Sequence, residues 1–133
     1  MNGIFVTWDE VCDTMLRMDI VGLWQWQEVY DAHEGAWQMV EARGTAVTIV
    51  YNLDLLAWHQ YPIHNIVGPM QNVYKMHHPN VEHVIAITGN QNVFVRSMVQ
   101  MLLRQLPQLQ TLSLVRNLDD ARQIAAQVSS SPS

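Results

Sequence analysis

Two short, almost wholly apolar segments constrain the fold of this chain more than any other feature of its sequence. They run from Val47 to Leu53 and from Val84 to Thr88, and both are rich in β-branched residues. Such a composition fits a central strand covered on both faces better than an edge strand. Because a helical pattern separates them, we predict that they lie side by side and parallel, joined by a right-handed crossover.

The first twenty residues show a different periodicity. Ile4 to Trp8 and Thr14 to Val21 predict an antiparallel hairpin around a polar turn, Asp9 to Asp13. The second of these strands alternates apolar with charged side chains, as a half-buried strand does. The alternating residues are Leu16, Met18 and Ile20 on one face, and Arg17 and Asp19 on the other.

Four amphipathic helices and one more strand complete the pattern. The helices are predicted from Trp26 to Val40 with a close at Arg43-Gly44, from about Pro69 to His77, from Gly89-Asn90 to Pro107, and from Asn117 to Val128, and the strand from Thr111 to Val115. The element order is β-β-α-β-α-β-α-β-α. It predicts a single α/β domain over residues 1–128, with a mixed, mostly parallel sheet of about five strands, an N-terminal antiparallel hairpin and flanking helices. Residues 129–133 are predicted to be a disordered tail.

Charge and cysteine content narrow the classes of partner. The net charge is -5, and the seven Lys and Arg residues are scattered singly from Arg17 to Arg122, so the cationic face that nucleic acid requires is not expected. Cys12 is the only cysteine, which suits a reducing compartment. The N-terminus lacks the pattern of a signal peptide, and no stretch reaches the roughly 20 apolar residues of a membrane span. We therefore expect a cytoplasmic protein without a membrane span.

Four short motifs occur in a recognisable order. They are Trp8-Asp9, the segment Gly22 to Trp26, the turn His78-Pro79-Asn80 leading into Val84 to Gly89, and the segment Asn117 to Arg122. With this order and spacing, residues 4–128 resemble the STAS-like (SpoIIAA-like) domains, and more narrowly a group of small bacterial STAS-like proteins. The resemblance implies a regulatory domain that docks onto other proteins without catalysing a reaction and without a cofactor.

The resemblance also implies a phosphorylation switch, from which this chain departs. In anti-sigma-factor antagonists a serine begins the helix after the central strand. The matching stretch here, Tyr51 to His64, contains no serine or threonine, and the first serine of the chain is Ser97. Because a phosphate needs a hydroxyl, we expect a protein-interaction module without the usual phosphorylatable serine.

The connection Asp54 to Asn65 is the strongest candidate binding segment. It follows the carboxyl end of a central strand, where open α/β sheets bind ligands, and it is unusually apolar for a surface loop. One interpretation is a hydrophobic docking patch for another protein, and the other is that its side chains fold back over the sheet edge. An alternative function is a small-molecule or lipid-binding domain with a pocket under this loop. The candidate residues are Asp54, Leu55, Leu56, Trp58, His59, Tyr61 and His64.

Trp24 is a second candidate contact. It lies two residues from Trp26, so the two rings cannot share one helical face, and one is free to meet a partner or a second copy of the chain. A homodimer is therefore among the expected assemblies.

Neither a catalytic nor a metal site is predicted. His59 and His64 share a loop with Asp54, but their spacing matches no zinc signature. His33 lies on the core stripe of a helix, where a hydrogen-bonded core histidine is the commoner outcome. The adjacent carboxylates Asp9-Glu10 and Asp119-Asp120 lack the apolar surroundings that would suit a catalytic acid.

Overall fold

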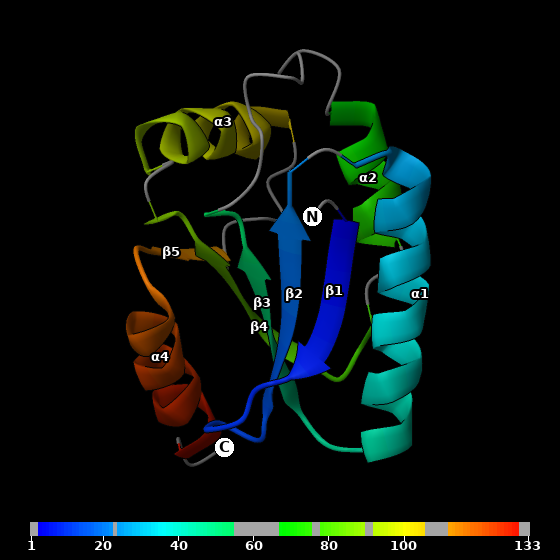
Figure 1. The fold of residues 1–133 in the computed structure, drawn as a ribbon, viewed down its shortest axis with the longest axis vertical. Helices are drawn as coiled ribbons and strands as arrows, with labels where there is room; N and C mark the ends of the chain where they lie inside the picture. The colour runs from blue at the N-terminus through cyan, green and yellow to red at the C-terminus, as the bar shows by residue number, and fades with distance from the viewer. Residues whose placement is uncertain are drawn as a thin grey trace.

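The computed structural model describes residues 3–22, 24–54, 67–75, 78–89, 92–105 and 112–130. Its element order is the predicted one, with five strands in a single sheet (Figure 1). The elements are β1 (Gly3–Trp8), β2 (Met15–Val21), α1 (Trp26–Arg43), β3 (Val47–Asn52), α2 (Val67–Lys75), β4 (Val81–Ile87), α3 (Asn92–Gln105), β5 (Leu112–Val115) and α4 (Leu118–Ser130).

The sheet is mixed and its strands follow sequence order. β1 pairs with β2 antiparallel, whereas β2, β3, β4 and β5 are parallel to one another. The decisive pair is β3 with β4, in which Ile49 lies beside Val84 and Val50 beside Ile85. The predicted parallel pair, the hairpin and the α/β class are therefore confirmed.

The sheet separates two apolar clusters. On one face, α1 and residues of α3 pack against β1 to β4; on the other, α4 packs against β4 and β5 (Figure 1). The first cluster includes Leu16, Met18, Ile20, Ala36, Val40, Ile49, Met98 and Val99. The second consists of Met15, Val50, Ile85, Ile87, Val115, Ala121 and Ala125.

Beyond Met15, which packs in the second cluster, the α4 face of β1 and β2 carries no described helix. Ile4, Val6 and Trp8 pack on the first cluster, so the alternate side chains of β1 point to the opposite face. We call that region the open half-face, and it consists of Phe5, Thr7, Arg17 and Asp19. In the strand register Phe5 lies opposite Asp19, and Thr7 opposite Arg17. Phe5 is 40% exposed there.

Local signals fix two helix ends as predicted. Gly44 follows α1 with φ of 73°, and its N–H donates to the Val40 carbonyl at 3.1 Å. The side chain of Asn117 accepts the Asp120 N–H at 2.8 Å and so caps α4, whose first turn holds two acids that suit its positive end.

Several boundaries differ from those predicted, and three of them shift by two or three residues. β4 begins at Val81 rather than Val84, because His83 finds a hydrogen-bond partner on β5 and Glu82 is exposed, so both fit a strand. α2 begins at Val67, which leaves Pro69 within its first turn, where the missing N–H has no intrahelical acceptor to lose. α4 continues to Ser130, two residues into the predicted tail. No helix in the described ranges is long and apolar enough to span a bilayer.

Candidate functional site

Asp54 lies at the carboxyl edge of the parallel strands, as predicted. It follows β3, and its N–H donates to the Asn52 side-chain oxygen at 3.3 Å. Its carboxyl group lies directly over Gly89, which follows the neighbouring strand β4. A side chain at Gly89 would overlap that carboxyl group, and its φ of +53° also favours glycine. The Asp54 carboxyl group and the Gly89 backbone are therefore in close contact, and only glycine leaves room for it.

This edge also presents an exposed apolar side chain. Val93, in the first turn of α3, is 81% exposed. It comes four residues after Gly89, so it belongs to the same end of the sheet as Asp54. The other predicted loop residues lie outside the described part of the chain: Leu55, Leu56, Trp58, His59, Tyr61 and His64.

Trp24 packs with its neighbour instead of pointing away from it. Its ring meets that of Trp26 edge-on, with centroids 4.8 Å apart, and both rings contact the core cluster under α1. Because α1 begins only at Trp26, Trp24 is not bound to helical geometry. Its role as a partner contact stays a prediction.

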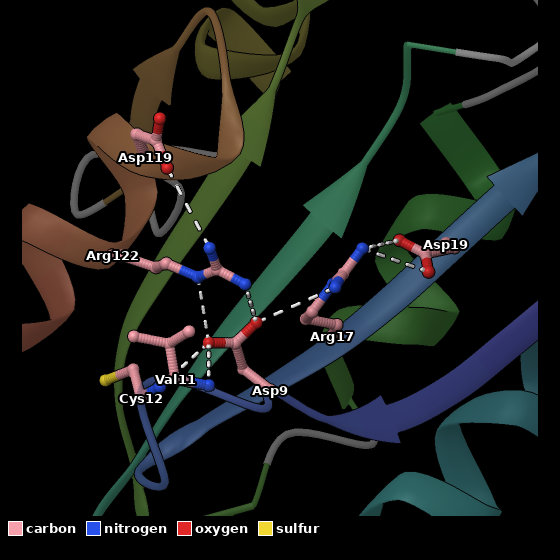
Figure 2. Close-up of polar contacts among 7 residues, drawn as sticks. All are labelled: Asp9, Val11, Cys12, Arg17, Asp19, Asp119 and Arg122. Carbon is pink, nitrogen blue, oxygen red and sulfur yellow. Dashed lines mark hydrogen bonds and ion pairs between the residues drawn. The ribbon is translucent and has the colours of Figure 1, made fainter.

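Sequence reasoning missed the most buried carboxylate, Asp9. Its side chain is wholly buried in the hairpin turn, and it accepts the backbone N–H groups of Val11 at 3.1 Å and Cys12 at 2.8 Å. Arg122 of α4 binds it through two nitrogens, each at 3.0 Å, and Arg17 of β2 approaches to 3.6 Å (Figure 2). We call the three residues Asp9, Arg17 and Arg122 the hairpin clasp.

The electrostatics of the hairpin clasp exclude proton transfer at neutral pH. Burial alone would raise the pKa of Asp9. Hydrogen bonds from Arg122 and from the two backbone N–H groups, with the charge of Arg122, outweigh burial and hold that pKa at about 2. Asp9 is thus a permanent anion saturated with donors. It fastens the hairpin turn to α4 and is not an acid or base catalyst.

One signal in the sequence could have revealed this contact. Trp8-Asp9 and the segment ending in Arg122 are two of the motifs behind the family resemblance, and the structure brings them together. The adjacent acid Glu10 is exposed, so the apparent carboxylate pair is split between two environments.

His33 is a core histidine with both ring nitrogens hydrogen-bonded, as predicted. Nδ1 lies 2.7 Å from the Val29 carbonyl, which can only accept, so Nδ1 carries the proton and donates. Nε2 then accepts from the Tyr51 hydroxyl at 2.8 Å. Burial lowers the pKa of His33 and raises that of Tyr51, so both groups are neutral at physiological pH.

A serine–histidine pair also forms, between β4 and β5. His83 Nε2 lies 2.8 Å from Ser113 Oγ. Within the described residues no carboxylate orients His83, so the pair lacks the third member of a nucleophilic triad. Nor do three His, Cys, Asp or Glu side chains of the described ranges lie together as metal ligands. His59 and His64, the weighed metal ligands, fall outside those ranges.

Comparison with known proteins gave no further guide. No protein-family model matches the chain, and a search of curated proteins likewise found no match.

Proposed function

We propose that this protein is a non-catalytic interaction module that docks onto another protein through the carboxyl edge of its parallel strands. The observation that carries the proposal is the exposure of Val93, in the first turn of the helix that follows Gly89. Open α/β sheets bind ligands at this edge, so an exposed apolar side chain here is available to a partner. The resemblance to STAS-like domains supports the same function.

The state of the ionisable groups favours docking over catalysis. Asp9 is held as an anion by Arg122 and two backbone N–H groups, and His33 and Tyr51 are hydrogen-bonded to each other. A catalytic group needs a pKa near the working pH and access to substrate. The described groups whose pKa values are shifted have the opposite properties. Their pKa values move away from neutral pH, and their hydrogen-bond partners lie within the protein.

The proposed docking surface continues into the loop that starts at Asp54. Trp58 and Tyr61 of that loop are the residue types that dominate interface energies. The loop offers no hydroxyl except that of Tyr61, so regulation of this surface by serine or threonine phosphorylation is not part of the proposal.

The experiment is affinity capture from native lysate with three variants. Trp58→Ala and Val93→Lys alter the proposed docking surface. Val11→Lys is the matched control, because Val11 is also strongly exposed, at 72%, but lies in the β1–β2 turn, at the opposite end of the sheet. We expect a captured protein to be lost, by tenfold or more, with the first two variants and retained with the third.

Two results would contradict the proposal. One is capture that ignores both Trp58→Ala and Val93→Lys. The other is equal loss with Val11→Lys, which would indicate a general effect of added charge. Circular dichroism of each variant confirms that it is folded.

A further inference from the structure

Within the described residues, no strand pairs with the outer edge of β1. The Asp9 N–H donates to the Met15 carbonyl at 2.9 Å, and this pair continues the β1–β2 register. Hydrogen-bonded pairs alternate in an antiparallel ladder, so Thr7 and Phe5 also bond toward β2. The N–H and C=O groups of Ile4, Val6 and Trp8 therefore point away from the sheet.

The sequence of β1 has none of the features that protect an edge strand. Its six residues contain no charge and no proline, and its pairing with β2 runs without a bulge. Natural proteins normally guard an edge strand with one of these devices or by making it short. The opposite edge follows that rule, because β5 has only four residues.

Side-chain burial also indicates an unfinished edge. On the covered face, Met18 and Leu16 of β2 are almost fully buried, whereas Val6 and Trp8, which lie opposite them, are only half-buried. A further strand beyond β1 would cover their outer sides.

We propose that a second copy of this chain occupies the β1 edge, with the two β1 strands antiparallel about a two-fold axis at Val6. In this register all three residues whose backbone groups point away from β2 form hydrogen bonds. Val6 pairs with Val6 of the other copy, and Ile4 of each copy pairs with Trp8 of the other. The register makes six backbone hydrogen bonds and joins the two sheets into one of ten strands. A two-fold interface must be self-complementary, and an uncharged strand pairs with itself without repulsion.

The same register places Phe5 opposite Thr7 of the other copy, on the open half-face. That pair is a non-hydrogen-bonded one, in which side chains approach most closely. The contact is separate from the docking surface at Asp54 and Val93, so the assembly does not depend on the proposed function.

The test is the mass in solution of charge variants at these two positions, measured by light scattering and sedimentation. Both side chains are exposed, so the core is left intact. We expect wild type at twice the mass of one chain. F5K/T7K places like charges opposite each other and should give single chains, whereas F5K/T7E places opposite charges together and should restore the doubled mass. Val11→Lys, off the edge, should leave the doubled mass unchanged.

A mixing experiment with two oppositely charged variants tests whether the separated chains are still folded. F5E/T7E should also be a single chain, and combined with F5K/T7K it should give the doubled mass. In wild type the Val6 N–H should exchange with deuterium at least tenfold more slowly than in F5K/T7K. The proposal is overturned if wild type is a single chain at every concentration, or if F5K/T7K and F5K/T7E have the same mass. Capture through the docking surface should be unaffected by these variants, so the two proposals fail independently.

Discussion

The two halves of the sheet differ in how many of the described helices cover them. β4 is packed by the α1 side on one face and by α4 on the other, and Ile85 and Ala86, which point to opposite faces, are both buried. Beyond Met15, the described helices cover β2 on one face only, so Met18 is buried while Asp19, the next residue, is half-exposed. The burial of successive side chains along each strand thus shows whether helices cover one face or both. The half covered on both faces contributes most to stability, and the half covered on one face leaves side chains exposed.

The largest difference should appear when one side chain from each half is truncated. Ile85→Ala removes a fully buried side chain beneath α4 and should lower the free energy of unfolding by about 3 kcal/mol. Phe5→Ala on the open half-face should cost less than about 1 kcal/mol. Denaturant titration below the concentration at which chains associate would measure both. Equal losses would mean that the open half-face is covered after all.

The hairpin clasp joins the two halves, and its loss should have the next largest effect. Asp9→Asn removes the charge that binds Arg17 and Arg122. A pKa reduced from 3.8 to about 2 corresponds to about 2 kcal/mol of stability at neutral pH. Since the folded pKa is the lower one, this contribution is present above pH 4 and is lost as the pH falls toward 2.

Denaturation at several pH values tests the clasp directly. Wild type should lose stability between pH 4 and pH 2 more steeply than Asp9→Asn. Parallel curves for the two proteins would contradict the assignment. The control is Glu10→Gln, which removes the neighbouring exposed acid and should leave the wild-type slope unchanged.

The sequence could predict features that depend on local patterns, but not contacts between distant residues. The apolar run from Val84 to Thr88 and the alternation from Leu16 to Ile20 are local patterns, and each correctly indicated a strand and its exposure. The hairpin clasp was not predictable in this way, because Asp9 and Arg122 are 113 positions apart and each looks like an ordinary surface charge. Long-range ion pairs have no periodicity.

The candidate site was predicted only in part, for a related reason. That Asp54 would lie at the carboxyl edge followed from its place after a central strand. Its contact with Gly89 did not, because it depends on the register of β3 against β4 and on a backbone angle. The residues of the loop after Asp54 stay predictions.

Gly89→Ala should have an effect similar to loss of the clasp, and it tests the carboxyl edge of β4, in the half of the sheet that helices cover on both faces. A side chain at positive φ costs about 1–2 kcal/mol, to which the overlap with Asp54 adds. In a double-mutant cycle with Asp54→Ala, the overlap with the carboxyl group is removed, whereas the 2.7 Å approach to the Cβ of residue 54 and the backbone cost remain. We therefore expect Gly89→Ala to be less destabilising in the Asp54→Ala background than in wild type. Additive losses would show that the two residues do not touch.

The smallest effect on stability concerns His33, which lies between α1 and the half of the sheet that helices cover on one face. The pH dependence of stability caused by His33 should show how tightly α1 packs on the sheet. Burial lowers the pKa of His33 below its ordinary 6.5. Below pH 6.5, His33 is therefore protonated in the unfolded chain to a greater extent than in the folded chain. Stability should therefore fall as the pH drops from 7.5 to 5.5, by at most about 1.4 kcal/mol per pH unit. His33→Gln has no titrating group and should flatten that part of the curve. Tyr51→Phe, which removes the hydroxyl donor but keeps the histidine, should cost about 1 kcal/mol at pH 7.5. A wild-type curve as flat as that of His33→Gln would mean that water reaches the ring, and that the layer between α1 and β3 is looser than the covered half under α4.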